Sequence, residues 1–215
     1  MKLFIDTAEV SQVREAWSWG IIDGVTTNPS HVAKSGRKPS EVYREICDIV
    51  DGPVSLETIA LDSETIVKEG RELAKIHKNV VIKVPIIKEG LKAVKILASE
   101  GYKTNVTVTF SPLQALLAAK VGATYISPFV GRLDAVGHDG MEVVRQIKTI
   151  YDNYGYKTQI ITAAARNPLH VLQAALAGSH VITMSYDILQ QLYQHPLTDV
   201  VLDSFLKDWA KIPVK

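Results

Sequence analysis

The chain has 215 residues, 47% of them hydrophobic, which is enough to build one buried core and lies within the range of a single α/β barrel. Its formal net charge is +1, with acidic and basic residues interspersed. This balance argues against nucleic acid or an anionic membrane as partner and favours a small molecule. No apolar run is long enough to span a bilayer and nothing resembles a signal peptide, so a cytoplasmic protein is expected.

Short apolar runs alternate with helical periodicity along the whole chain. The predicted strands are residues 2–6, 24–28, 53–57, 80–85, 103–109, 125–129, 159–164 and 180–185. Helical patterns follow the strands, and Ser111 to Gln114 has the form of a capping box. A loop is predicted at 130–137, before a helix that opens at Asp139. A short helix at 187–193 and an amphipathic tail at 197–212 finish the chain.

Eight β-then-α units in unbroken alternation predict a parallel sheet with right-handed crossovers, closed into a (β/α)8 TIM barrel with an additional C-terminal helix. An open doubly wound sheet would normally show a glycine-rich phosphate turn after its first strand, and this sequence has none. We expect a single domain, residues 1–215, with the barrel at about 1–194 and a helical tail at about 195–215.

Lys83 stands inside an apolar, β-branched run, residues 80–85. An unpaired buried ammonium is costly, so a lysine there often has a lowered pKa or a covalent role. A neutral amine can form a Schiff base with a ketone, and the protonated imine is an electron sink for the neighbouring carbon–carbon bond. For any single lysine in such a run, the commoner explanation is that it reaches solvent or pairs with a carboxylate. The residues around Lys83 must therefore decide between this explanation and a covalent role.

Polar residues recur where the predicted strands end, and in a barrel these ends meet at the active site. They are Asp6, Thr26, Asn28, Glu57, Lys83, Asn105, Thr107, Ser127, Arg166 and Ser185. Helix capping or strand propensity could explain any one of them. Together they resemble the equipment of an imine-forming carbon–carbon lyase or transferase.

The chemistry suggests roles for several of these residues. Imine formation and hydrolysis need an acid/base and a positioned water, which Glu57 and Thr107 could supply, and Asp6 could remove the proton of a sugar hydroxyl. Arg132 and Arg166 follow the sixth and seventh strands, where guanidinium groups suit a phosphate monoester.

The six histidines show no paired spacing of metal ligands, and we interpret all of them as structural or solvent-facing. We therefore expect no metal and no cofactor.

Five segments, taken together and in this order, resemble the small transaldolases, which share a family with fructose-6-phosphate aldolase. The segments are residues 4–8 (FIDTA), 26–30 (TTNPS), 81–85 (VIKVP), 105–111 (NVTVTFS) and 126–132 (ISPFVGR). The resemblance covers essentially the whole chain, and the TTNPS block and the lysine strand are its most specific parts.

The resemblance implies a TIM barrel that forms a homopentamer or decamer and acts in the pentose phosphate pathway. It implies that Lys83 carries the dihydroxyacetone imine and that Asp6 and Glu57 transfer protons. It further implies sugar-phosphate substrates, with the donor hydroxyls held by Asn28, Asn105 and Ser127 and the phosphate held by Arg132 and Arg166.

Two positions bear on the exact reaction. Ala164 stands where family members commonly have a serine, which removes one hydroxyl donor to phosphate. Phe129 stands where the related aldolases carry tyrosine, and Glu57 where they tend to have an amide. These features favour transaldolase over an aldolase that releases dihydroxyacetone. A catalytically silent sugar-phosphate binder is the third hypothesis, which Lys83, Asp6 and Glu57 argue against.

Overall fold

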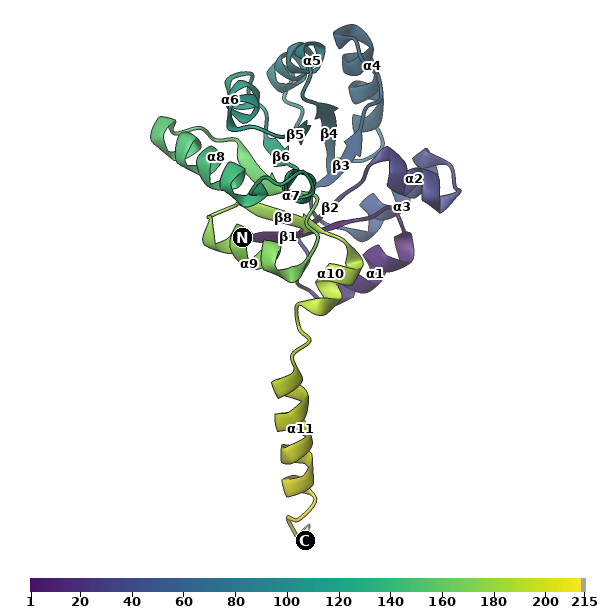
Figure 1. Ribbon diagram of the computed structural model, residues 1–215. Helices are drawn as coiled ribbons and strands as arrows, with labels where there is room; N and C mark the ends of the chain where they lie inside the picture. The colour runs from purple at the N-terminus through teal and green to yellow at the C-terminus, as the bar shows by residue number, and fades with distance from the viewer. Residues whose placement is uncertain (214–215) are drawn as a thin grey trace.

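The computed structural model describes residues 1–213 and shows eight parallel strands in a closed barrel, in chain order from β1 to β8 (Figure 1). Each strand pairs with its sequence neighbours, and β1 closes on β8. The strands are β1 Lys2–Asp6, β2 Gly24–Thr26, β3 Val54–Glu57, β4 Val80–Pro85, β5 Thr104–Thr109, β6 Tyr125–Pro128, β7 Gln159–Thr162 and β8 Val181–Met184. The predicted TIM barrel is confirmed.

Helices surround the barrel and follow the strands in the predicted alternation (Figure 1). None in the described part of the chain is long and apolar enough to cross a membrane. They are α1 Val10–Ser18, α2 Pro29–Ser35, α3 Pro39–Ile49, α4 Ser63–Ala74, α5 Lys88–Ser99, α6 Pro112–Lys120, α7 Val130–Asp134, α8 Gly140–Tyr154, α9 Pro168–Leu176, α10 Tyr186–Gln191 and α11 Pro196–Trp209.

Several helices begin where the sequence places a cap followed by proline. Asn28 and Asn167 accept hydrogen bonds from the backbone N–H of the third residue of α2 and α9, and Ser111 forms the predicted capping box with Gln114. Proline in the first turn adds a backbone angle already suited to a helix. These caps fix where each chain segment leaves the mouth of the barrel.

An apolar cluster plugs the barrel below the site and consists of Phe4, Val81, Tyr125, Ile161 and Val181. Side chains two positions apart on a strand share a face, so the next layer on these strands presents Asp6, Lys83, Ser127, Ala163 and Thr183. The polar layer therefore lies directly above a layer of apolar side chains that fills the barrel interior. Gly24 belongs to this arrangement, since a β-carbon there would lie 2.7 Å from the ring of Phe4.

The structure corrects some expected boundaries. The predicted loop at 130–137 is wrong in part, because residues 130–134 form the short helix α7. The strands β2, β7 and β8 end before residues 28, 164 and 185, and Asn28 and Ser185 serve as helix caps instead.

The tail helix α11 projects away from the barrel, and none of its residues is buried (Figure 1). The barrel of its own chain does not cover it.

Candidate active site

A cavity of about 680 Å³ opens at the C-terminal ends of the strands. Its wall contains ten of the twelve residues that the sequence proposes for the site, contributed by segments far apart in the chain. They are Asp6, Thr26, Asn28, Glu57, Lys83, Ser127, Phe129, Arg132, Arg166 and Ser185. Asn105 and Thr107 do not line it.

Lys83 lies on β4 directly beside Glu57 on β3, its register partner. Its Nζ is 3.1 Å from Glu57 Oε2 and donates a hydrogen bond of 3.0 Å to the carbonyl oxygen of Thr27. The side chains are 6% and 13% exposed, so the pair is largely withdrawn from water. The buried lysine is thus paired with a carboxylate, and Glu57 is placed to receive a proton from the amine.

Asn105 lies behind the cavity wall and holds Ser127 in place. The hydroxyl of Ser127 donates to Asn105 Oδ1 at 2.7 Å, and Asn105 Nδ2 donates to Ser55 Oγ at 3.2 Å. All three side chains are buried. Because Asn105 is the register partner of Lys83, this network fixes a hydroxyl near the lysine.

Thr107 is fully buried, and its hydroxyl has no hydrogen-bond partner among residues 1–213. A buried hydroxyl without a partner is unfavourable unless a water or another molecule satisfies it. It lies two residues beyond Asn105 on β5, opposite Pro85 of the lysine strand. Thr107 therefore has a free polar group next to the site.

Two cavity residues have the left-handed backbone that non-glycine residues rarely adopt, Val108 with φ 61° and Ala164 with φ 56°. Val108 lies where the pairing of β5 with β6 shifts register. Such strained positions concentrate at functional sites, where surrounding structure holds them. The cavity mouth is therefore shaped by backbone irregularity as well as by side chains.

Arg132 on α7 and Arg166 after β7 both line the cavity, and neither forms an ion pair within residues 1–213. Their two segments are joined by His170, whose Nδ1 accepts from the backbone N–H of Arg166 at 3.1 Å. His170 Nε2 therefore carries the hydrogen and faces Asp134 Oδ2 of α7 at 2.7 Å. The unpaired guanidinium groups are available to an anion.

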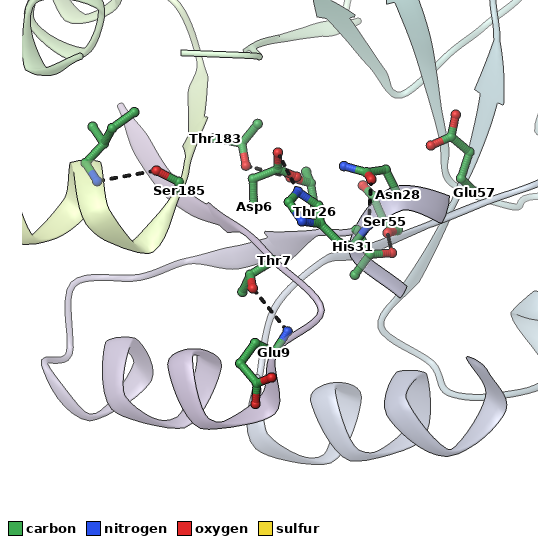
Figure 2. Close-up of polar contacts among 12 residues, drawn as sticks. Asp6, Thr7, Glu9, Thr26, Asn28, His31, Ser55, Glu57, Thr183 and Ser185 are labelled. Carbon is green, nitrogen blue, oxygen red and sulfur yellow. Dashed lines mark hydrogen bonds and ion pairs between the residues drawn. The ribbon is translucent and has the colours of Figure 1, made fainter. Parts of the chain in front are cut away.

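Asp6, Thr26 and Thr183 form a hydrogen-bonded row at the ends of β1, β2 and β8, and His31 of α2 completes it (Figure 2). Burial by itself raises the pKa of Asp6. The hydrogen bond from His31, the charges of Lys83 and His31 and the hydroxyl of Thr26 outweigh burial and hold the pKa below its usual 3.8. Asp6 is thus a stabilised carboxylate.

Asn28 and Ser185 lie at the cavity edge with one oxygen already used for helix capping. Asn28 Oδ1 accepts from the N–H of His31 at 3.0 Å, and Ser185 Oγ accepts from that of Ile188 at 3.4 Å. The Asn28 amide nitrogen and the Ser185 hydroxyl hydrogen are left to donate to a ligand.

The sequence interpretation missed six polar residues of the cavity wall, namely Ser30, His31, Lys34, Thr183, Asp187 and Gln191. Thr183 could have been found, because it stands two positions before Ser185 within the strand predicted at 180–185. His31 was interpreted as structural or solvent-facing, and the structure adds that it lines the cavity and contacts Asp6.

With lysine, carboxylates and unpaired arginines in one cavity, the site suits an anionic carbonyl substrate. The sequence matches the family described as Transaldolase/Fructose-6-phosphate aldolase over residues 3–212. Proteins named "Probable transaldolase" from Dictyoglomus turgidum and Geotalea uraniireducens are 59% and 60% identical, each over 99% of this chain and 100% of its own length. One from Aquifex aeolicus is 56% identical over 100% of this chain and 99% of its own.

Among solved structures, the chain resembles a thiamine phosphate pyrophosphorylase from Pyrococcus furiosus with a TM-score of 0.60. The identity is 17%, over 86% of this chain and 85% of that one, so this likeness concerns the fold alone. The family match and the full-length relatives agree with the resemblance found in the sequence. The chain belongs to the transaldolase/fructose-6-phosphate aldolase family.

Proposed function

We propose that the protein is a transaldolase that moves a dihydroxyacetone unit from a ketose phosphate to an aldose phosphate through a Schiff base on Lys83. The donors are sedoheptulose 7-phosphate or fructose 6-phosphate, and the acceptors glyceraldehyde 3-phosphate or erythrose 4-phosphate. The observation that carries the proposal is the buried pair of Lys83 and Glu57, 3.1 Å apart in the cavity wall. A sugar-phosphate binder without catalysis would gain nothing from a buried lysine.

The first half of the reaction uses three side chains. Glu57 takes a proton from Lys83, and the free amine adds to the ketose carbonyl and loses water to give the protonated imine. Asp6 then takes the proton of the sugar hydroxyl next to the bond that breaks. The carbon–carbon electron pair moves into the imine, leaving an enamine on Lys83, and the shortened aldose phosphate departs.

The second half reverses this chemistry with a new aldehyde. The enamine adds to the acceptor, Asp6 returns its proton to the new hydroxyl, and water hydrolyses the imine. We assign this water to Glu57 and Thr107, supported by the buried, unpartnered hydroxyl of Thr107. The amide nitrogen of Asn28 is left to donate to a sugar hydroxyl, and the oxygen of Ser127, held from behind by Asn105, is left to accept from one.

The alternative function is fructose-6-phosphate aldolase, which releases dihydroxyacetone without an acceptor. The transaldolase and aldolase reactions differ in how long the enamine on Lys83 survives. The deciding experiment therefore measures release of glyceraldehyde 3-phosphate from fructose 6-phosphate with and without erythrose 4-phosphate. A transaldolase needs the acceptor for sustained turnover. Equal rates with and without it would establish the aldolase instead.

Phe129→Tyr should increase acceptor-independent cleavage several-fold and lower transfer to erythrose 4-phosphate. Phe129 lines the cavity and packs edge-to-face on Phe110, with ring centroids 5.9 Å apart. A phenol there can bind a water that a phenyl ring excludes. This favours hydrolysis of the intermediate on Lys83 over its survival until an acceptor binds. Phe110→Tyr adds the same hydroxyl to the ring behind, outside the cavity wall, and is the matched control. An unchanged ratio of transfer to cleavage would remove Phe129 from this role.

We further propose that α11 docks on a second copy of the chain, within a pentamer or decamer as the resemblance implies. Its apolar side chains are exposed, and its own barrel does not cover them. An isolated helix of 14 residues is marginal in water and gains its stability from packing. The exposed apolar residues of α11 are Leu197, Val200, Val201, Leu202, Phe205, Leu206 and Trp209, and the exposed Ile212 follows the helix.

Truncation after His195 should therefore give smaller species in light scattering. Phe205→Ala combined with Trp209→Ala should weaken assembly in the same direction, because both remove large exposed apolar side chains. The control is Lys207→Ala, which breaks only the exposed pair with Asp203 on the same helix. An oligomer of unchanged size after truncation would show that α11 is not the contact.

The proposal takes residues 1–215 as one functional domain, with the barrel at about 1–194 and the assembly tail at about 195–215. The substrates are freely soluble sugar phosphates of the non-oxidative pentose phosphate pathway. A cytoplasmic enzyme without a membrane or nucleic-acid partner, a metal or a cofactor fits this reaction.

A further inference from the structure

The carboxylate of Asp6 is held by two different kinds of partner, one on each oxygen. Oδ1 accepts a hydrogen bond of 2.7 Å from the hydroxyl of Thr26, which itself lies 2.6 Å from that of Thr183. Oδ2 faces the Nε2 of His31 at 3.3 Å (Figure 2). The Asp6 and His31 side chains are 26% and 28% exposed and both line the cavity, so a substrate can approach the pair.

Local structure places His31 in this position. Asn28 lies two residues beyond the end of β2 and caps α2 by accepting from the N–H of His31, and Pro29 starts the first turn. Side chains of a helix lean toward its N-terminus, so the imidazole at the third position is directed back over the strand ends. The seven-residue helix stops at Gly36 in the left-handed conformation, so His31 lies in a short, well-bounded element.

Asp6 alone is poorly matched to the task that the proposed function gives it. A general base works best when its pKa is close to the working pH, because it must both be deprotonated and hold the incoming proton. Even an ordinary aspartate has a pKa of about 4, far below neutral pH, and the contacts of Asp6, that with His31 included, lower its pKa further. A second group that shares the proton would remove this mismatch, and imidazole is the side chain that ordinarily titrates between about pH 5 and 8.

We propose that His31 and Asp6 act as one acid–base unit, in which His31 acts through Asp6 by sharing the proton that Asp6 takes. This rests on the proposed transaldolase reaction. The form that reacts has a carboxylate and a neutral imidazole whose hydrogen is on Nδ1, so that Nε2 is bare. When the carbon–carbon bond breaks, the O–H electron pair of the sugar forms the aldehyde C=O, and the proton taken by Asp6 comes to lie between Asp6 Oδ2 and His31 Nε2. On addition to the acceptor it returns to the new alkoxide. No oxidant or other reactant is needed.

Other charged groups share the cavity with the pair and set the field around it. Lys83 acts directly on Asp6 by its charge. The cavity wall supplies the others: Lys34 on the same helix, Glu57, Arg132, Arg166 and Asp187. Removing only the imidazole therefore separates its effect on the pH profile from theirs, since all of these remain in the variant.

The test measures kcat and KM against pH for wild type, His31→Gln and His31→Leu, with fructose 6-phosphate and erythrose 4-phosphate. In wild type the unit must be unprotonated before cleavage, so kcat falls on the acid side. In both variants the lone carboxylate is a weaker base than the unit. The acid limb, which is the fall of kcat at low pH, should therefore move to lower pH by at least about one unit, and kcat at pH 8 should fall about fivefold to twentyfold. KM changes less than about twofold, because the substrate contacts remain.

The matched control is His138→Gln, the same change at an exposed histidine outside the cavity, which should leave the profile of wild type unaltered. His31→Gln keeps a side-chain donor able to reach Asp6, so it distinguishes loss of the imidazole from loss of a contact. Thermal unfolding of each variant checks that it is folded.

A His31→Gln protein with the acid limb and kcat of wild type would overturn the inference. A fall in kcat at every pH without movement of the limb would also overturn it, because His31 would then only hold Asp6 in place. Failure of the proposed function is a different result, in which wild type itself neither transfers nor forms an adduct on Lys83.

Discussion

Sodium borohydride added with fructose 6-phosphate should fix a reduced three-carbon adduct on Lys83 and abolish activity. Borohydride reduces the imine to a stable amine, and Lys83 is the lysine buried in the cavity beside a carboxylate. Mass spectrometry of peptides locates the adduct. Lys83→Ala and Lys83→Arg should each lower turnover by about 10³-fold or more, because neither residue can form the imine.

The two variants at Lys83 separate chemistry from stability. Lys83→Ala leaves the mostly buried Glu57 without its partner, a change that typically costs about 3–5 kcal/mol. Lys83→Arg keeps a positive charge for Glu57, so inactivity of a folded arginine variant concerns the amine alone. Lys120→Ala, at an exposed lysine of α6, is the control and should keep both adduct and activity. An adduct on another lysine, or full activity in Lys83→Ala, would refute the assignment.

The barrel could be predicted because buried parallel strands are written as nearly continuous apolar runs. The predicted strands at 2–6 and 80–85 agree with β1 and β4 to the residue. The helix α7 was missed because its five residues are too few to show a helical period and no side chain caps its start. The direction of α11 was not predictable either, since periodicity gives an apolar face but not its partner.

The site could be predicted as far as strand alternation determines it. Asp6 and Lys83 stand two residues beyond the plug residues of their strands, so the pattern fixes the face on which they lie. The pattern does not fix how deep a side chain lies in the barrel. Asn105 and Thr107 are fully buried and do not line the cavity, and the register shift of β5 against β6 between Val106 and Thr109 left no sign in the sequence.

His31 could not be predicted because its contact depends on tertiary structure. It is carried by a helix, and its contact with Asp6 exists only because α2 folds back over the ends of β1 and β2. A histidine without a ligand partner nearby in the sequence gives no sign of this.

Arg132→Ala and Arg166→Ala should each raise KM for glyceraldehyde 3-phosphate as acceptor far more than KM for glyceraldehyde, which differs only by the phosphate. Both guanidinium groups line the cavity without an ion pair in the described residues, so a bound phosphate is their first charged partner. A charge-assisted hydrogen bond is worth about 1.5–3 kcal/mol, which corresponds to ~10- to 150-fold in KM. Ala164 offers no hydroxyl to the phosphate, so the arginines must supply more of its binding.

A double variant tests whether the two arginines hold the same phosphate. The segments that carry them are tied together through His170 and Asp134, so a shared ligand should make the losses non-additive. Arg145→Ala is the matched control, because this arginine is already paired with Glu142 and Asp139 on the outside of α8. If each cavity variant impaired both acceptors equally, the arginines would be structural and the phosphate would have to be bound elsewhere.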